Sequence, residues 1–314
     1  MSAERQPSQR CTPREVQEGS PIHLGLCGQN IQHSRSPILQ RTNAHMCGYP
    51  LKYSLFDEAE SAFVERVTSA ETSTKLLGLN VTTPFKEVAF NLCDDRTDVA
   101  ERAGAINTLA WSDQGKLIGH NTDVEGVSVL LSHTPLPPSP NTALILGAGA
   151  ASRAAAIAVL QRGVSSLIWV SRSPQGGREI IEWTRNQSRD IDVAWVSAQG
   201  DESIGSSAGV EVNKVDLVIA ATPPLELERW LQLEHRLKNK LGAQLGLDPI
   251  GVFIDLNYGE RTKGSYEWAL QSERIWVDGA RMLVAQGVAS FQWWTGCQLD
   301  EAEVWSNMST YWKT

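Results

Sequence analysis

Hydrophobic residues between positions 21 and 131 fall into two alternating patterns. Short, continuous apolar runs predict buried strands, and apolar residues spaced three or four apart predict helices. Strands are predicted at 21–28, 51–55, 76–81, 106–111 and 117–121. Helices are predicted at 37–47, 59–68, 84–92 and 123–131. This alternation of strands and helices indicates an α/β domain.

A proline-rich segment, residues 132–140, separates this pattern from a second one of the same kind. Its prolines predict a stiff, extended connector. Beyond it, strands are predicted at 142–146, 166–170, 192–195, 216–220 and 252–255. Helices are predicted at 150–161, near 178–184 and at 225–237, and a mobile loop rich in Gly and Ser at 197–208.

Helical spacing returns in residues 280–295 and 301–311. We expect these two helices to pack back on the first domain, which would make that domain discontinuous in sequence. The predicted fold class is therefore α/β, with two α/β domains. The first comprises residues 21–122 plus 280–314, and the second comprises residues 123–279.

Composition narrows the class of protein. The 314 residues suffice for two separate cores, and 41% hydrophobic with 20% charged residues is ordinary for a soluble globular protein. A net charge of −8 without a basic stripe argues against nucleic-acid binding. No apolar run reaches the roughly 18 residues of a membrane span. We expect a cytoplasmic protein, monomeric or homodimeric, whose partner is a small molecule.

The five cysteines are scattered and form no CxxC pair. This usage predicts reduced thiols in the cytosol rather than a disulfide framework or a zinc site. The six histidines are also dispersed, so no metal site is predicted. Residues 1–20 are polar, mix arginine with glutamate and lack the apolar stretch of a signal peptide, so we expect a disordered tail.

A glycine-rich turn follows the predicted strand 142–146, in the sequence Gly147-Ala148-Gly149-Ala150-Ala151-Ser152-Arg153. Glycine allows the backbone to approach a pyrophosphate, and the N-terminus of the next helix offers free N–H groups. The strand before the turn and the alanine-rich helix after it supply the context of a dinucleotide site.

The end of the next strand distinguishes the two nicotinamide cofactors. An acidic residue there binds the ribose 2′-hydroxyl of NAD, whereas arginine accommodates the 2′-phosphate of NADP. Here the strand is followed by Ser171-Arg172-Ser173, without an acid, and Arg153 is a second cation in the turn helix. Since arginine binds phosphate bidentately, NADP is favoured. The alternative is that Arg172 is only a solvated loop residue.

Four polar motifs precede the glycine turn and carry hydroxyls, amides, a lysine and an aspartate. They are His33-Ser34-Arg35-Ser36-Pro37, Asn80-Val81-Thr82-Thr83-Pro84-Phe85-Lys86, Ala105-Ile106-Asn107-Thr108 and Asn121-Thr122-Asp123. Taken in order with the turn and with residues 278–286, the set resembles the shikimate dehydrogenase family over residues 21–296. The resemblance implies an NADP-dependent oxidoreductase that reversibly reduces 3-dehydroshikimate to shikimate in the synthesis of aromatic amino-acid precursors. It further implies that the first domain binds substrate and that the second is Rossmann-like and binds NADP.

The resemblance assigns the acid–base chemistry to Lys86 and Asp123. A desolvated lysine can exchange a proton with an oxygen, and a carboxylate can hold the ammonium and accept from a substrate hydroxyl. The alternatives are a solvated lysine on a helix surface and an N-cap aspartate. The resemblance assigns substrate binding to Ser34, Ser36, Asn80, Thr82, Asn107, Tyr258 and Gln286. Ser36 before Pro37 also suits a helix N-cap, and Tyr258 could equally be a packed aromatic residue.

Cofactor binding is assigned to residues of the turn, of the next strand end and of two later segments. They are Gly147, Ala148, Gly149, Ala150, Ala151, Ser152, Arg153, Ser171, Arg172, Ser173, Thr222, Gly279 and Met282. The chain departs from the family pattern at Ala150, where a glycine is usual, at Pro223-Pro224, where a Ser/Gly-rich run is usual, and at Gln40, where a histidine is frequent. Quinate or quinate/shikimate dehydrogenase activity stays open, since a site can accept an added hydroxyl with little penalty. A non-catalytic relative that senses the metabolite is the third reading.

Overall fold

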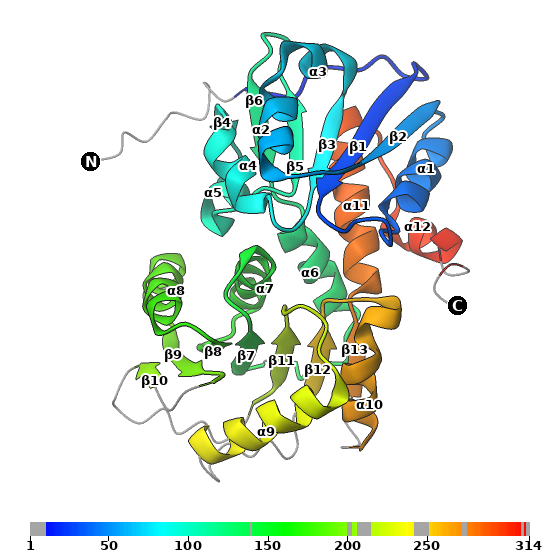
Figure 1. The fold of residues 1–314 in the computed structure, drawn as a ribbon. Coiled ribbons are helices and arrows are strands. Elements are labelled where there is room, and N and C mark those ends of the chain that lie inside the picture. The colour runs from blue at the N-terminus through cyan, green and yellow to red at the C-terminus, as the bar shows by residue number, and fades with distance from the viewer. Residues whose placement is uncertain are drawn as a thin grey trace. The chain divides into compact units, whose positions relative to one another are not determined.

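The computed structural model describes residues 11–138, 140–199, 203–205, 215–241, 251–271, 275–308 and 311. The chain divides into two compact units. Unit 1 contains residues 1–126 and 283–313, and unit 2 contains residues 127–282. The two boundaries fall within helices α6 (Asp123–Ser132) and α11 (Ala280–Thr295), which are green and orange in Figure 1.

Unit 1 is built on a six-stranded sheet with the order β2-β1-β3-β5-β6-β4. Its strands are β1 (Ile22–Gly28), β2 (Leu51–Asp57), β3 (Gly78–Val81), β4 (Asp95–Arg96), β5 (Thr108–Trp111) and β6 (Leu117–His120). Strands β2, β1 and β3 are parallel, β5 runs antiparallel to both of its neighbours, and β4 is parallel to β6.

The helices of unit 1 come from both ends of the chain. They are α1 (Ser36–Met46), α2 (Glu60–Thr68), α3 (Ala70–Lys75), α4 (Lys86–Leu92), α5 (Asp98–Ala103) and α12 (Glu301–Met308), with the greater part of α11. Helix α11 is part of the core, because the indole N–H of Trp294 donates to the Leu109 carbonyl at 2.9 Å. A Cβ at Gly78 would lie 2.1 Å from that indole nitrogen, so only glycine lets the helix approach β3.

Unit 2 is built on a seven-stranded sheet with the order β10-β9-β8-β7-β11-β12-β13, parallel except for β10. Its strands are β7 (Thr142–Leu146), β8 (Ser166–Ser171), β9 (Asp192–Ser197), β10 (Ser203–Gly205), β11 (Leu217–Ala220), β12 (Val252–Asp255) and β13 (Ile275–Asp278). The strand order reverses at β7, between β8 and β11. Ligands of open α/β sheets bind at such a switch point, beyond the carboxyl ends of the strands.

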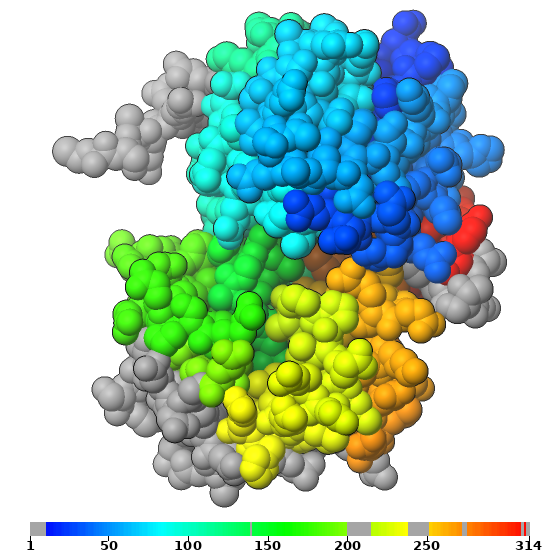
Figure 2. Space-filling model, in the orientation of Figure 1, coloured from blue at the N-terminus to red at the C-terminus, as the bar shows by residue number. Residues whose placement is uncertain are grey.

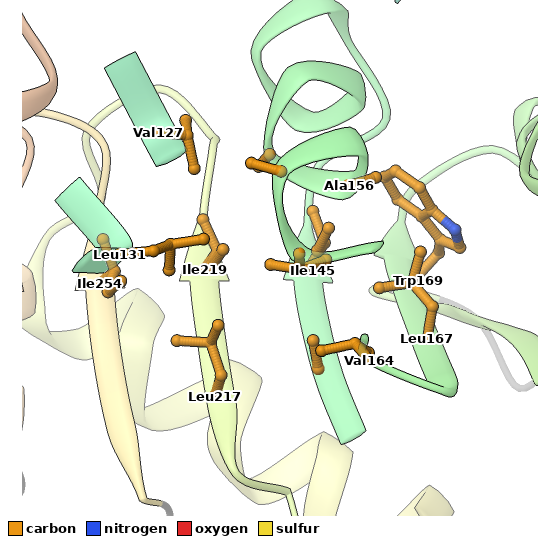
Figure 3. Close-up of a cluster of buried hydrophobic side chains, with 14 of the residues drawn as sticks. Val127, Leu131, Ile145, Ala156, Val164, Leu167, Trp169, Leu217, Ile219 and Ile254 are labelled. Atoms are coloured by element: carbon orange, nitrogen blue, oxygen red, sulfur yellow. The ribbon is translucent and has the colours of Figure 1, made fainter. Parts of the chain in front are cut away.

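Helices cover both faces of the second sheet. They are α6, α7 (Ala150–Gln161), α8 (Pro174–Gln187), α9 (Leu227–Leu241), the 3-10 helix η2 (Gly259–Thr262) and α10 (Lys263–Gln271). Alternate strand residues face opposite sides, as the period of a strand requires. Ile145, Ile219 and Ile254 pack toward Val127 of α6 and Ala156 of α7 (Figure 3).

The residues between them along the same strands face the other helices. Leu144, Val218 and Phe253 contact Trp230 of α9 and Trp268 of α10. Helix α9, yellow in Figure 2, forms the surface over this face of the sheet. The near-continuous apolar runs of these strands agree with the burial of both faces of the sheet.

The predicted disordered tail is wrong for residues 11–20. The Arg14 N–H donates to the Trp111 carbonyl at 2.9 Å. The Arg14 guanidinium donates to the carbonyls of Ser73 at 2.8 Å and Leu76 at 2.6 Å, at the end of α3. The last carbonyls of a helix have no partner within the helix, so they can accept from an arginine. Arg14 can therefore hold the segment in place even though its sequence shows no hydrophobic pattern. Residues 1–10 lie outside the described residues.

The prediction that the cysteines are reduced thiols is wrong for Cys47 and Cys297, which form a disulfide across a sequence separation of 250 residues. The C-terminus of α1 and the segment after α11 come together, with the two Cα atoms 6.4 Å apart. Spacing along the chain carries no signal for such a long-range pair. Cys11, Cys27 and Cys93 are free.

Most other elements lie within a few residues of their predicted positions. Helices α3 and α5 and strand β4 were not predicted, nor were α10 and β13. Residues 203–205 of the predicted loop 197–208 form β10, and residues 200–202 and 206–208 of that loop lie outside the described residues. Among the described helices none combines the length and apolar character needed to cross a bilayer.

Candidate active site

A lysine and an aspartate that lie 37 residues apart in the sequence form an ion pair in unit 1. Lys86 is the first residue of α4 and Asp123 the first of α6. The Nζ of Lys86 donates to Oδ2 of Asp123 at 2.6 Å, and the two side chains are 15% and 5% exposed. The surface-lysine alternative therefore does not describe Lys86. A nearly buried, charge-assisted pair of this kind can exchange a proton with a third group.

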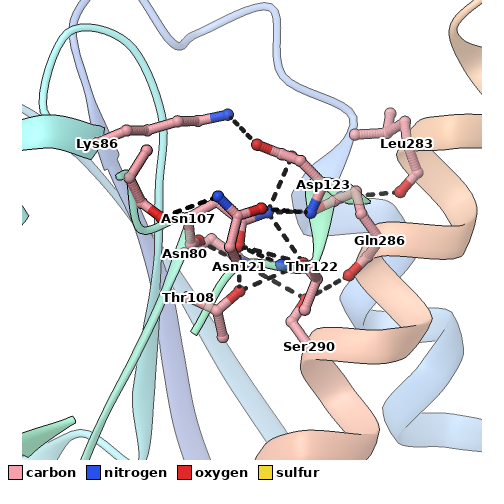
Figure 4. A network of polar contacts seen from close by, with 11 residues as sticks. Asn80, Lys86, Asn107, Thr108, Asn121, Thr122, Asp123, Leu283, Gln286 and Ser290 are labelled. Carbon is pink, nitrogen blue, oxygen red and sulfur yellow. Dashed lines mark hydrogen bonds and ion pairs between the residues drawn. The ribbon is translucent and has the colours of Figure 1, made fainter. Parts of the chain in front are cut away.

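Asn107 fixes the carboxylate of this pair (Figure 4). Its Nδ2 donates to the second carboxylate oxygen, Oδ1 of Asp123, at 2.9 Å and to the Thr122 hydroxyl at 2.9 Å. Its Oδ1 accepts from the Thr122 backbone N–H at 2.8 Å and from the Thr108 hydroxyl at 2.9 Å. Because both ends of the amide have partners, its orientation is determined. One oxygen of Asp123 thus faces the amide and the other faces Lys86.

A second set of contacts surrounds Asn80 on β3. The Tyr53 hydroxyl on β2 donates to Oδ1 of Asn80 at 3.0 Å, and Nδ2 of Asn80 donates to the Ser290 hydroxyl on α11 at 3.3 Å. Burial raises the pKa of Tyr53, so its hydroxyl stays protonated. Tyr53 and Ser290 were not among the predicted site residues. Tyr53 stands at an ordinary buried position of its strand, where the sequence does not separate a packed aromatic from a polar contact.

The remaining predicted substrate residues fall into two groups. Ser34 and Ser36 lie together before and at the start of α1, with their hydroxyls 3.2 Å apart. The Gln286 Oε1 atom accepts from Asn107 at 3.4 Å, while Nε2 of Gln286 donates to the Leu283 carbonyl at 2.8 Å. Thr82 is half-buried directly after β3. Tyr258 belongs to unit 2.

His120, at the end of β6, fills a structural role. Its Nδ1 atom lies 2.8 Å from the Thr97 hydroxyl, and its ring stacks on Trp293 with centroids 5.1 Å apart. Burial lowers the pKa of His120 to about 4. A neutral, packed imidazole is not a proton donor near neutral pH, so His120 is not a candidate acid for this site.

The glycine turn lies at the switch point of the second sheet. Gly147 has φ +110°, and a Cβ there would lie 2.9 Å from the Ala221 carbonyl oxygen after β11, so the residue must be glycine. A Cβ at Gly149 would meet nothing within 4 Å. Within the described part of the chain, the buried hydroxyls of Ser152 and Thr222 have no hydrogen-bond partner. An open backbone face beside two unsatisfied donors fits a phosphate-bearing ligand.

The other predicted cofactor residues are distributed around the same strand ends. Arg172 is exposed after β8. The Ser171 hydroxyl accepts from the Trp195 indole at 2.8 Å, and the Ser173 hydroxyl caps α8 by accepting from the Gly176 N–H at 3.2 Å. Met282 is 8% exposed and packs in the core of unit 2. Among the described residues no group of three His, Cys, Asp or Glu side chains could hold a metal ion.

The two α/β units, one of them Rossmann-like and the other carrying a lysine–aspartate pair, define the class of dinucleotide-dependent dehydrogenases. The model of the shikimate dehydrogenase substrate binding domain matches residues 26–109, and that of the shikimate 5′-dehydrogenase C-terminal domain matches residues 279–306. The shikimate dehydrogenase (NADP(+)) of Xylella fastidiosa strain 9a5c is 34% identical over 288 residues, covering 90% of this chain and 94% of its own length. The chain belongs to the shikimate dehydrogenase family, and the predicted resemblance is confirmed.

Two further matches extend over similar lengths. The shikimate dehydrogenase (NADP(+)) of Stenotrophomonas maltophilia strain K279a is 30% identical over 283 residues, covering 90% of this chain and 93% of its own. The crystal structure of shikimate 5-dehydrogenase from Thermus thermophilus in complex with shikimate superimposes with a TM-score of 0.69. It is 24% identical and covers 93% of this chain and all of that one (100%), so it supports the fold.

Proposed function

We propose that the chain is an NADP-dependent shikimate dehydrogenase, which reversibly reduces 3-dehydroshikimate to shikimate. The observation that carries the proposal is the nearly buried Lys86–Asp123 pair, held by Asn107 in a chain of this family. Neither residue belongs to the hydrophobic clusters of unit 1. A buried ion pair is weak evidence for stability, which makes a chemical role the better account of it.

The pair manages the proton at the reacting oxygen. The Lys86 ammonium donates to the oxygen of the substrate carbonyl as it becomes an alkoxide, and takes the proton back in the reverse direction. Asp123 holds the ammonium through Oδ2 and accepts from a neighbouring ring hydroxyl. Acid–base help of this kind contributes about 10²–10⁴ in rate, the remainder coming from orientation.

The substrate carboxylate is assigned to the hydroxyls of Ser34 and Ser36, which lie at the start of α1 and suit an anion. The ring hydroxyls are assigned to Asn80, Thr82, Asn107 and Gln286, with Tyr258 as a further contact. Asn107 is held by Asp123 and Gln286, and Asn80 by Tyr53 and Ser290. These amides are therefore oriented before the substrate binds, which lowers the entropy cost of binding.

Bound NADPH would supply the hydride to the carbonyl carbon, and NADP⁺ would accept it in the reverse direction. The main-chain N–H groups of residues 148–151 and the Ser152 hydroxyl would hold the pyrophosphate. Gly147 would contribute the tight turn, since its N–H donates to the Val170 carbonyl at 2.8 Å. Arg153 and Arg172, with Ser171 and Ser173, would bind the 2′-phosphate, because guanidinium recognises phosphate oxygens bidentately. Thr222, Gly279 and Met282 would line the nicotinamide end. The open space at Gly149 and the Ser152 hydroxyl, unpartnered among the described residues, support this assignment.

The test is the initial rate of reduction of NADP⁺ and of NAD⁺ with shikimate and with quinate. We expect turnover with shikimate and NADP⁺. Faster turnover of quinate than of shikimate would indicate that the protein is a quinate dehydrogenase. No turnover in any pairing, with shikimate still binding, would favour a sensor of the metabolite and direct attention to Ala150 and Pro223.

Replacement of Lys86 tests the mechanism. Lys86→Ala should lower kcat by about 10²–10⁴-fold and leave the NADPH dissociation constant unchanged. The matched control is Lys75→Ala, which removes an exposed lysine paired with Glu71 on α3 and should change neither quantity. Unchanged kcat in Lys86→Ala would refute the acid–base role.

A further inference from the structure

The residue that follows strand β12 and Leu256 makes contacts in two directions. The side-chain Nδ2 of Asn257 donates to the Thr222 carbonyl at 3.0 Å, in the loop between β11 and α9. The main-chain carbonyl of Asn257 accepts from the Gly279 N–H at 2.8 Å, in the turn between β13 and α11. The three strands are neighbours in the sheet (Figure 1), so Asn257 links the two loops on either side of its own.

Asn257 is itself held by a buried carboxylate. Oδ1 of Asp255 accepts from both the backbone N–H of Asn257, at 2.9 Å, and its Nδ2, at 2.8 Å. The other carboxylate oxygen accepts from the Ser265 hydroxyl at 2.6 Å, and Asp255 is 2% exposed. Both hydrogens of the Asn257 amide therefore have acceptors, one in its own loop and one on Thr222. The side chain has one orientation that satisfies both.

Each of the two linked loops has a further feature that bears on cofactor binding. The Thr222 hydroxyl is buried and finds no hydrogen-bond partner among the described residues, which leaves it available to a ligand. At Gly279 a Cβ would lie 2.3 Å from the Leu256 carbonyl oxygen, so the turn can only be glycine and packs directly against the Asn257 loop. Because the Asn257 hydrogen bonds run to both loops, they help to set the position of one loop relative to the other.

We propose that Asn257 is a positioning residue of the cofactor site, which fixes the Thr222 and Gly279 loops in the arrangement that binds the nicotinamide half of NADP(H). The inference rests on the proposed function, and it assigns to Asn257 a role through the two loops rather than a contact with the cofactor. Loss of the side-chain amide leaves the Thr222 carbonyl and the Asp255 carboxylate each short of one donor, so the first loop loses its fixed position.

The test measures NADPH binding to the full chain by quenching of its tryptophan fluorescence, so it does not depend on turnover. Asn257→Leu keeps the volume and removes both donors, and Asn257→Ala removes the side chain. Each should weaken NADPH binding by about three- to tenfold, the effect of one or two hydrogen bonds. The dissociation constant for shikimate, measured by calorimetry without cofactor, should stay within about twofold.

The matched control is Thr184→Val on α8. The Thr184 hydroxyl accepts from the Trp169 indole at 3.0 Å and is fully buried in unit 2, far along the chain from either loop. Its loss should cost stability without weakening NADPH binding. Equal weakening in Thr184→Val, or wild-type affinity in both Asn257 variants, would overturn the inference while leaving the proposed function intact. Absence of NADPH binding by the wild-type chain would overturn both.

Discussion

Lys86 occupies a position that helix electrostatics disfavours. A cation at the N-terminus of a helix faces the positive end of the macrodipole, which costs about 0.3–1 kcal/mol. Asp123, 2.6 Å away, offsets this, and the same dipole argument favours Asp123 at the start of α6. A lysine kept at an unfavourable helix position by one carboxylate is more readily explained by chemistry than by folding.

Tyr53 offers a test of the second set of contacts. Tyr53→Phe keeps the ring but leaves Oδ1 of Asn80 without its donor, so the amide is free to turn. We expect the KM for shikimate to rise by about three- to tenfold, since one buried hydrogen bond is lost, with a smaller change in kcat. Steady-state kinetics checks this split. A fall in kcat alone, at unchanged KM, would contradict a role in substrate binding.

His120 makes stability depend on pH. Its pKa in the folded protein is about 4, below the ordinary 6.5, so the unfolded chain takes up the proton first. The contribution of neutral His120 is complete above pH 6.5 and is lost as the pH falls toward 4, by at most about 3 kcal/mol. His120→Phe keeps an aromatic ring against Trp293. Urea unfolding should show the wild type losing stability relative to His120→Phe as the pH falls from 6.5 toward 4, and a difference independent of pH would argue against this account.

The residues that the sequence revealed are those whose type is unusual for their place. A lysine after Pro84, an aspartate after Asn121 and glycines directly after a strand stand out. Tyr53 and Ser290 do not, because an aromatic residue in a strand and a serine within an apolar helix are also ordinary packing residues. Tyr53 and Ser290 lie 27 and 210 residues from Asn80 in the sequence. A single sequence gives no indication that residues so far apart are in contact.

At the scale of the element, segments with a clear hydrophobic pattern were predictable, whereas several elements without one were missed. Strand β7 and helices α7 and α11 have the predicted bounds. Helix α5 has six residues, too few for a hydrophobic period, although its signals are present. The Thr97 hydroxyl accepts from the Ala100 N–H, and Gly104 ends the helix in the left-handed region. Strand β4 has only two residues and is defined by its pairing with β6, which its own sequence does not reveal.

The disulfide joins two elements that are also joined by packing. Cys47 follows α1 and Cys297 lies beyond α11, and the side chains of Gln40 and Asn43 donate to the Gly287 carbonyl of α11. Reduction, or Cys47→Ser, should lower the free energy of unfolding by about 2–4 kcal/mol through the unfolded chain. The noncovalent contacts should preserve kcat under native conditions.

Denaturant unfolding with and without reductant, beside a kcat measurement, checks that prediction. Cys11→Ser is the matched control, because Cys11 is free and half-buried and should alter neither quantity. An unchanged unfolding free energy on reduction would show that the bond does not form in the protein. Loss of activity when the disulfide is broken would show that the contacts between α1 and α11 alone do not maintain the site.

At the scale of the molecule, the two units should respond to different ligands. Hydrogen exchange slows where a ligand binds the folded state, by an amount set by its concentration relative to Kd. Shikimate alone should protect amides near Ser36, Lys86 and Asp123, and NADPH alone should protect residues 147–153 and 222. Mass-spectrometric hydrogen exchange with each ligand separately checks this. Protection of residues 147–153 by shikimate alone would contradict the assignment of the cofactor to unit 2.

The discontinuity of unit 1 bears on how the protein is made. A ribosome that synthesises this chain delivers all of residues 127–282 before it delivers Phe291 and Trp294. Those two residues complete the core around Ile22 and Leu24. Unit 2 can therefore fold during translation, whereas the N-terminal strands must wait beside it with part of their apolar surface uncovered. At about 5–20 residues per second this delay is on the order of ten seconds or more. During that time a chaperone could bind the exposed apolar surface of unit 1 before α11 covers it.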